Sequence, residues 1–553
     1  MSEEHEDTED DTEKDVKPKT SQEDCDTPPQ KGGKTFLKGA GILAGAGIIC
    51  RVLGVIFRVP LTNIVGNYGM GLYQMVFPLY ALLLIVSSAG VPVAISKMIA
   101  RKDENPKKIL FNAIILLGVI GLAMSVLFAI FSHSIASLQG NKSVGVIYLA
   151  IAPSVFIVCI ISAFRGYFQG LQNMVPTAVS QIIEQSVKMA TGITLALLLY
   201  PFGVVWAVFG AILAVTVSEV VALGYLLIVF LRGKNVPVES KQLAKDAKKA
   251  WGKRFDKDIM MRIIKQSLPI TAMASIFPLI LVFDSLVIIN LLKAAGRSGE
   301  EATQLFGIQS GAVHTLINLP AVIGVALATA VVPAISSLIK QKKQKDIRTH
   351  AALAIKLSVL VSIFFMTFYL FFAERIINLL YNGAFRDNPA HFNVAARLLR
   401  IESAMILLMG ISMVFAAMLQ AADKSKLPLI ALGVGGVAKV AFELAFITTP
   451  MGIYAVSISN VICFGLAATI TTFFALRKFK IQDKLVRVLW KVAVLAIVYV
   501  LALWLLGTII PDGRWWIVII GVLGAIMYGI AVFLLKMFDV SEQKVFNCIR
   551  GRT

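Results

Sequence analysis

Residues 36–64 read FLKGAGILAGAGIICRVLGVIFRVPLTNI. The stretch is long and apolar enough to cross a bilayer as one helix, yet Arg51 and Arg58 lie inside it. A helix rises ~1.5 Å per residue, so the two guanidinium groups lie ~10 Å apart along the axis and share one face. A guanidinium in lipid near the bilayer centre costs at least ~2.5–3.5 kcal/mol, so this face is predicted to border a polar cavity inside the protein. Snorkelling outward is the alternative for Arg58, whereas Arg51 lies too deep for it.

The composition excludes a soluble globular protein. Of the 553 residues, 57% are hydrophobic, and the mean hydropathy is +0.78. Such values are typical of a multi-pass membrane protein. The net charge of +20 does not indicate nucleic-acid binding, because the basic residues cluster in short loops between apolar spans. The five cysteines are scattered without the spacing of a metal or redox site, so neither a metal nor an organic cofactor is expected.

Hydropathy predicts an all-α protein with fourteen membrane spans. They cover residues 36–64, 69–99, 108–132, 144–171, 176–200, 203–231, 262–292, 305–338, 348–373, 393–421, 427–448, 452–475, 486–509 and 514–537. The loops after spans two, eight and twelve are rich in Lys and Arg, whereas four of the alternate loops carry no basic residue. Only the segment 374–400, with four arginines, departs from this alternation. Both termini are therefore expected to be cytoplasmic, in a protein of the cell membrane.

The composition also divides the chain into regions. Residues 1–34 are acidic with almost no apolar side chains, which predicts a disordered tail. In the longest loop, residues 243–251 mix Lys with apolar residues at helical spacing; they are expected to lie on the inner membrane surface, with a solvated linker as the alternative. The predicted regions are the tail 1–34, an N-lobe 35–231, a cytoplasmic linker 232–261, a C-lobe 262–477, a helix pair 478–537 and a cytoplasmic tail 538–553.

The two halves of the chain repeat. Span two ends in VPVAIS at residues 91–96, and span eight ends in VPAIS at residues 332–336. Lys188 follows Gln169 by 19 residues, just as Lys439 follows Gln420. Six spans per half is an even number, so the two six-helix lobes share one orientation and are related by an axis along the membrane normal. The last two spans fall outside the repeat.

Several charged residues lie within the predicted spans, where ionisable groups are functional by default. Glu184 with Lys188, and Lys439 with Glu443, are spaced to pair on one helix face, where they either function or only neutralise each other. Asp284 has no partner nearby in the sequence and needs a cation from another helix, a bound ion or a proton. The remaining charges in the spans are Glu219, Lys356 and Glu402, and His314 and Asn318 share one face of span eight. No nucleotide-binding loop or nucleophile constellation is present, which argues against an ATP-driven pump and against most enzymes.

Three stretches resemble the polysaccharide-transport branch of the MOP exporter superfamily. They are RVLGVIFRVP at 51–60, GLYQ at 71–74 and SAGVPVAISK at 88–97. The nearest likeness is to the SpoVB-type and MurJ-type flippases of Gram-positive bacteria, and it covers most of residues 35–537, including the two extra C-terminal helices. Two features depart from that pattern. Val59 stands where an acidic residue often follows the second arginine, and residues 83–85 are LLI where the family has arginine.

The resemblance implies a monomeric lipid II flippase for peptidoglycan synthesis, which moves an undecaprenyl-pyrophosphate-linked precursor to the outer leaflet. It implies a V-shaped cavity between the lobes in which Arg51 and Arg58 face the pyrophosphate, with His314 and Asn318 on the matching helix. It also implies a cation site for which Asp284 and Glu443 are suited, unless Lys439 replaces the ion. Transport would then be coupled to Na⁺, to H⁺ or to the membrane potential. Membrane lipids and the cell-wall synthesis machinery are the other partners it implies.

Other functions fit the same residues less closely. A flippase for another polyprenyl-linked glycan, of capsule, teichoic or spore-related type, is the first alternative. An ion-coupled drug exporter of the MATE type is the second, but the arginine pair and the two extra helices weigh against it. A membrane glycosyltransferase would need a carboxylate-bearing domain outside the membrane, and the predicted outer loops are short.

Overall fold

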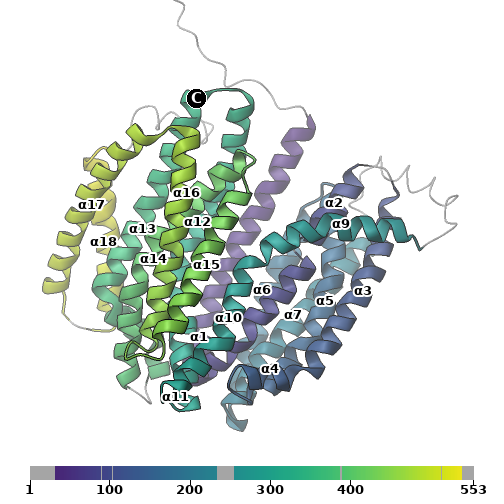
Figure 1. Ribbon diagram of the computed structural model, residues 1–553, viewed down its shortest axis with the longest axis horizontal. Helices are drawn as coiled ribbons and strands as arrows, with labels where there is room; N and C mark the ends of the chain where they lie inside the picture. The colour runs from purple at the N-terminus through teal and green to yellow at the C-terminus, as the bar shows by residue number, and fades with distance from the viewer. Residues whose placement is uncertain are drawn as a thin grey trace, which may run out of the picture.

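The protein is an all-helical bundle of two lobes that stand side by side (Figure 1). This computed structural model describes residues 31–88, 90–101, 104–232, 255–385, 389–511 and 513–537. Most of the predicted acidic tail, the amphipathic segment 243–251 and the C-terminal tail 538–553 lie outside the described residues.

The helices of the first half form the N-lobe. Those of the second half, apart from the first of them, form the C-lobe. The first half comprises α1 (Lys31–Ser88), α2 (Gly90–Ala100), α3 (Pro106–Ile130), α4 (Ser132–Leu138), α5 (Val144–Gly170), α6 (Val175–Leu199), the short η1 (Tyr200–Phe202) and α7 (Val204–Arg232). The second half comprises α9 (Lys257–Ala274), α10 (Ile276–Ala294), α11 (Gly299–Phe306), the π-helical turn η2 (Gly307–Val313), α12 (His314–Lys340), α13 (Gln344–Tyr381), η3 (Asn382–Phe385), α14 (Pro389–Ala421), α15 (Lys426–Phe446), α16 (Tyr454–Phe479), α17 (Gln482–Ile509) and α18 (Trp516–Leu534).

Helix α1 is a hairpin of two membrane spans. Its backbone leaves the helical conformation at Gly66, where φ is 69°, a value that favours glycine. The rings of Phe57 and Tyr73 lie 6.5 Å apart, although sixteen residues of straight helix would separate them by ~24 Å. The described residues contain 13 apolar stretches long enough to span a membrane, and the first of them includes this hairpin. The prediction of about fourteen spans is therefore confirmed.

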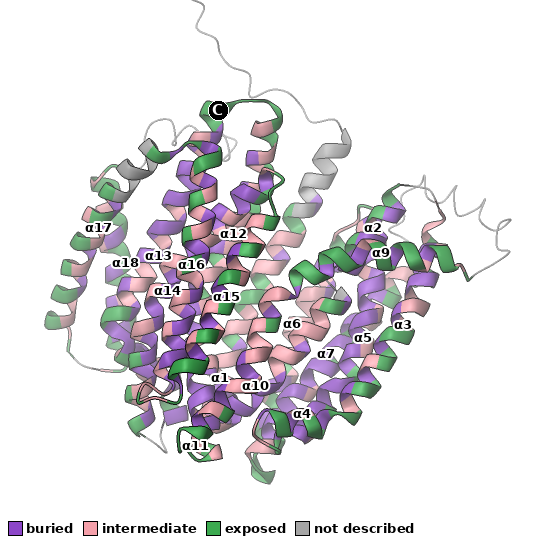
Figure 2. Ribbon diagram, viewed as in Figure 1, coloured by how far each residue is buried: buried purple, intermediate pink, exposed green. Residues whose placement is uncertain are grey.

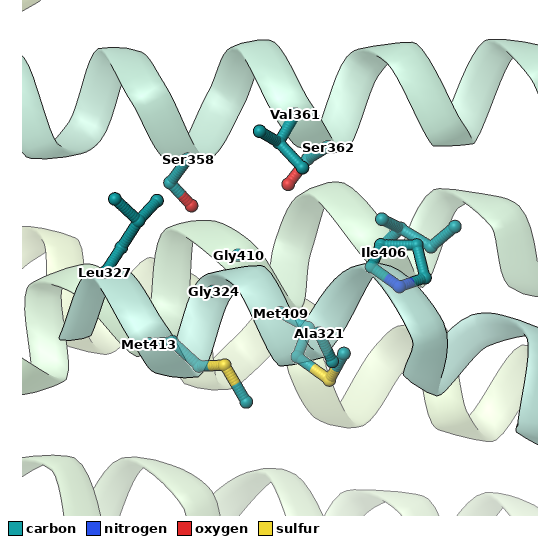
Figure 3. A pocket seen from close by; sticks show the side chains of 11 residues that line it. Ala321, Gly324, Leu327, Ser358, Val361, Ser362, Ile406, Met409, Gly410 and Met413 are labelled. Carbon is teal, nitrogen blue, oxygen red and sulfur yellow. The ribbon is translucent and has the colours of Figure 1, made fainter. Parts of the chain in front are cut away.

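Small side chains bring the C-lobe helices close together. Ser358 and Ser362 of α13 point towards Gly324 of α12 and Gly410 of α14 (Figure 3). A Cβ atom on Gly410 would lie only 2.4 Å from the Ser362 hydroxyl. The gap that remains here has a volume of about 10 Å³, at most one water molecule. Helix association in membranes relies on such close packing, because lipid is as apolar as the helix surface.

Large apolar side chains on the outer faces of the bundle remain exposed (Figure 2). On α3 they include Val119 and Leu122, and on α17 they include Leu501 and Trp504. In a membrane protein these faces contact lipid tails. The extra pair, α17 and α18, packs against α13 and so extends the C-lobe on the side away from the N-lobe.

Helix α9 belongs to the second half of the chain but packs on the N-lobe. Ile259 and Ile263 are buried in one apolar cluster with residues of α2 and α3. A Cβ atom on Gly90 of α2 would lie 2.3 Å from the carbonyl oxygen of Ser267, so the two backbones touch. Lys108 Nζ of α3 lies 2.8 Å from an Asp256 carboxylate oxygen at the start of α9. The helix breaks at Ser275, and α10 beyond it contacts both α1 of the N-lobe and α15 of the C-lobe.

The lobes meet at the end where α4 and α11 lie, at the bottom of Figure 1. The amide of Asn67 donates to the Ala384 carbonyl at 2.9 Å, and the amide of Gln74 donates to the Ser310 carbonyl. A Cβ atom on Gly71 would lie 2.1 Å from the Thr303 carbonyl oxygen, and one on Gly307 equally close to that of Asn67. We call this set of contacts between α1 and the segments 303–310 and 380–385 the inter-lobe contact.

Candidate functional site

A cavity of about 1020 Å³ separates the lobes above the inter-lobe contact. Helices α1 and α6 line it from the N-lobe, and α12, α14, α15 and α16 line it from the C-lobe, with α9 and α10 between them. The lining extends to Gln420 and Ser425, beside the connection between α14 and α15. That connection lies at the end opposite the inter-lobe contact, so the cavity is closed at one end of the bundle.

Three cationic side chains, all from the N-lobe, line the cavity. Arg51 is exposed within it. Arg58 lies 5.4 Å from the centre of the Phe77 ring and donates a long hydrogen bond of 3.4 Å to Thr315 across the cavity. Lys188 of α6 is the third cation. Among the described lining residues there is no Asp or Glu, so the cavity presents about three positive charges to whatever enters.

Lys188 lines the cavity, and its neighbour Glu184 pairs with a different cation. The carboxylate of Glu184 lies 2.8 Å from the guanidinium of Arg165 on α5, and Arg165 also donates to Ser180. The pairing of Glu184 with Lys188 that their spacing allows is therefore not the ion pair that forms. Arg165 was missing from the predicted intramembrane charges. It could have been found from the sequence, because it is a charged residue inside the apolar span 144–171.

The C-lobe contributes neutral groups to the same cavity. Asn318 and Thr315 of α12 lie in its lining, as do Gln420 and several apolar side chains. His314, predicted with Asn318 as a substrate ligand, is not among the described lining residues and lies one position before Thr315. The two walls thus differ, because the three cations line only the N-lobe wall, whereas the C-lobe wall offers neutral hydrogen-bonding and apolar side chains.

A buried charge cluster lies inside the C-lobe. Lys439 of α15 is 2% exposed and forms ion pairs with Asp284 of α10 and with Glu443, at 3.1 Å. Ser459 of α16 donates a 2.7 Å hydrogen bond to Glu443. Three alternatives were expected for Asp284: a cation from another helix, a bound ion or a proton. The structure shows the first of them, the ammonium of Lys439. We call Asp284, Lys439 and Glu443 the C-lobe triad.

Three other charged side chains of the predicted spans are buried. Glu219 of α7 accepts a hydrogen bond from the hydroxyl of Tyr80, and Lys356 of α13 donates to the Met537 carbonyl at 2.8 Å. Glu402 of α14 is fully buried and accepts hydrogen bonds from three side chains. Sequence reasoning gave Glu402 no role, because its partners lie on other helices, far away in the chain.

The two helical lobes and the cavity between them define the class of protein to which this chain belongs. The chain is a multi-pass membrane protein of the transporter type, with two helical lobes around a cationic cavity. The model of the polysaccharide biosynthesis protein family matches residues 36–339, and the MatE family model matches residues 310–447. The first match covers more than half of the chain, which therefore belongs to the polysaccharide biosynthesis protein family, within the MOP superfamily.

Individual proteins of known sequence agree with this family. Stage V sporulation protein B of Bacillus subtilis (strain 168) is 33% identical over 357 residues, which are 64% of this chain and 68% of that protein. The lipid II flippase MurJ of the same strain is 25% identical over 442 residues, 74% of this chain and 77% of the relative. A further relative, 24% identical over 392 residues, which are 68% of this chain and 80% of that protein, is named multidrug export protein MepA of Staphylococcus aureus (strain NCTC 8325 / PS 47).

Solved structures share the fold. A lipid II flippase MurJ in an inward closed conformation superposes with a TM-score of 0.66 and 16% identity, covering 89% of this chain and 98% of that one. An inward-facing MATE multidrug transporter gives a TM-score of 0.64 with 17% identity, covering 78% of this chain and 96% of the other. At these identities the likeness supports the two-lobed architecture alone.

Proposed function

We propose that the protein is a flippase that moves a lipid-linked cell-wall precursor, lipid II, from the inner to the outer leaflet. The observation that carries the proposal is the cavity of about 1020 Å³ with three cations and no carboxylate among its described lining residues. A pyrophosphate is a dianion that hydrocarbon excludes, and a guanidinium offers it paired, charge-assisted hydrogen bonds. Arg51 and Arg58 would hold the pyrophosphate, with Lys188 as an added point charge.

The opposite wall suits the sugar part of such a substrate. Asn318 and Gln420 offer amide donors and acceptors to hydroxyl groups, and the aromatic rings of Phe277 and Phe464 offer apolar faces. The polyprenyl tail stays in the lipid while the head group crosses. Rocking of the two lobes then exposes the cavity to each side in turn, and breaking the inter-lobe contact is the step that opens the closed end.

The driving force in this proposal acts on buried charges. The C-lobe triad holds two carboxylates and one ammonium, so Lys439 takes the position that a bound cation would take between Asp284 and Glu443. The membrane potential acts on the cavity cations with ~2.3 kcal/mol per charge per 100 mV. The positive cavity disfavours cationic drugs as substrates.

A second polyprenyl-linked substrate has an observation in its favour. The relative with 33% identity is named for stage V of sporulation, and a further relative, 26% identical over 313 residues, is named sporulation protein YkvU. A precursor of the spore wall or another polyprenyl-linked glycan carries the same pyrophosphate. It would use the same cations and differ only at the neutral wall.

Reconstitution into vesicles tests the proposal. Purified protein is inserted into vesicles that contain fluorescent lipid II, and the fraction accessible to a membrane-impermeant reductant is followed with time. We expect flipping by the wild type and none by Arg51→Ala, with Lys142→Ala, a cation removed outside the cavity, as the matched control. Transport of a different polyprenyl-linked glycan but not of lipid II would identify the alternative substrate. Flipping of neither by a folded protein would refute the proposal.

A further inference from the structure

Glu402 is a buried carboxylate without an ion pair in the described structure. Its side chain is 0% exposed, and one oxygen, Oε1, accepts all three of its hydrogen bonds. The donors are the amide of Gln309 at 2.8 Å, the hydroxyl of Ser457 at 2.8 Å and the amide of Asn460 at 3.2 Å. The other oxygen, Oε2, is buried and has no partner among the described residues. A buried polar atom without a partner needs an explanation, and an exchangeable proton is one.

The charges around Glu402 do not neutralise it. The groups that face it from η2 and α16 are the neutral side chains just named. On α15 the nearby cation is Lys439, which already has two carboxylate partners in the C-lobe triad. On α13, Tyr369 and Tyr381 donate their hydroxyls to backbone carbonyls of α12 and η2, and α12 itself begins with His314. Glu402 and the triad together therefore hold three carboxylates and one ammonium.

The donor set fits a proton better than a metal ion. Two amides and a hydroxyl point hydrogen atoms at Oε1, so a metal ion would require both amides to turn their oxygens inward. A proton on Oε2 leaves all three donors directed at Oε1, and it removes the negative charge that strengthens their hydrogen bonds. It also removes an uncompensated charge from the protein interior, where such a charge is most costly.

One residue of the site is joined to the inter-lobe contact. Gln309, which donates to Glu402, precedes Ser310, whose carbonyl accepts the hydrogen bond from Gln74 of the N-lobe. Both residues lie in η2, a π-helical turn of seven residues. Single π-helical turns are rare, strained relative to the α-helix and frequent at functional sites. The ionised carboxylate holds Gln309, and thereby η2, by a charge-assisted hydrogen bond.

From this geometry we infer that Glu402 is a proton-binding site whose charge state controls the inter-lobe contact through η2. With Glu402 ionised, Gln309 fixes η2 and presents the Ser310 carbonyl to Gln74. A proton on Oε2 weakens the bond to Gln309, η2 relaxes towards an α-helix, and the rotated Ser310 carbonyl leaves Gln74. Proton binding thus favours separation of the lobes at that end. The inference uses the rocking motion of the proposed function but not its substrate.

Distance measurements between spin labels test this inference without any lipid substrate. The labels are placed on Ser143→Cys in the N-lobe and Asn382→Cys in the C-lobe, both exposed, after the native cysteines have been replaced. Acidification of the wild type should shift the ratio of long to short distances by about 5- to 150-fold, the usual range of coupling between two sites. Glu402→Gln, which mimics the protonated form, should give the long distance at every pH.

Two controls separate the site from other buried carboxylates. Glu219→Gln should keep the pH response, because the hydrogen bond of Glu219 is to Tyr80 and none joins it to η2 in the described part of the chain. Acid-minus-alkaline infrared spectra of the wild type should contain a protonated-carboxyl band that Glu402→Gln lacks. A pH response that survives in Glu402→Gln would overturn the inference, as would a wild type whose distances respond to Na⁺ at fixed pH but not to acid.

A second variant decides the question if Glu402→Gln does not fold. Gln309→Leu leaves Ser457 and Asn460 on the carboxylate and removes only the link to η2. It should keep the infrared band but lose the distance response. A response equal to that of the wild type would refute the coupling.

Discussion

Adding one methyl group at Gly71 should break the inter-lobe contact. A Cβ atom at this position would lie 2.1 Å from the Thr303 carbonyl oxygen, and a backbone atom cannot rotate away. Restoring an ordinary separation of at least 3.4 Å requires α1 and α11 to move apart by about 1.3 Å. That shift also strains the bond from Gln74 to Ser310. Overpacking of this kind costs ~1–3 kcal/mol. Gly71→Ala should therefore shift the equilibrium towards the open arrangement by about 5- to 150-fold.

The rate of thiol modification reports the opening. A cysteine in place of Ser310 keeps the backbone carbonyl that Gln74 uses, and its half-buried side chain becomes more accessible to a hydrophilic reagent when the lobes separate. We expect Gly71→Ala to raise the modification rate in proportion to the shift. Gly45→Ala, on the same helix with no atom within 4 Å of the added carbon, should leave it unchanged. Equal rates in the two variants, with both proteins folded, would refute the reasoning.

Three further predictions concern the charges and the orientation. Arg51→Lys should lose much of the lipid II flipping and Arg51→Ala all of it, at matched protein abundance, because the ammonium keeps the charge without the bidentate fork; normal flipping by Arg51→Ala would remove the cavity arginine from the substrate site. Lys439→Met should lower the abundance of the protein in the membrane, because breaking a buried ion pair costs ~3–5 kcal/mol, whereas Asp284→Asn should not, since the ammonium keeps its second carboxylate. Immunoblots of matched cultures compare the two variants, and equal abundance would contradict the charge argument. In intact cells an impermeant thiol reagent should label Ser143→Cys but not Gln344→Cys, and the reverse pattern would invert the predicted orientation.

Hydropathy was sufficient to predict the membrane-spanning helices. The spans are predictable because backbone in lipid must be helical, and each span therefore leaves a local apolar signal. Breaks within a span leave a weaker signal. The π-helical turn η2 interrupts the continuous apolar run 305–338, and the helix break at Ser275 lies inside the predicted span 262–292. Both depend on tertiary contacts that no local pattern encodes.

The candidate site was only partly predictable. Arg51 and Arg58 were identified because a charge within an apolar run is visible in one helix. Pairing is a property of two helices, so local spacing suggested Lys188 for Glu184 when the partner is Arg165 on another helix. In the same way, Asp284 lies 155 residues from Lys439 in the sequence, and only the packing of α10 against α15 brings them together.

The position of α9 has a consequence for how the protein is made. Ile95 and Ile99 of α2 are buried in a cluster that Ile259 and Ile263 complete, and those two residues leave the ribosome after the whole N-lobe. The first lobe therefore cannot finish folding when its own six spans have been inserted, and must wait for the start of the second half. A gene split at the midpoint of the repeat would leave this cluster open in one fragment. A split after Ala274 would keep it whole, so co-expressed fragments should reassemble more readily when divided there.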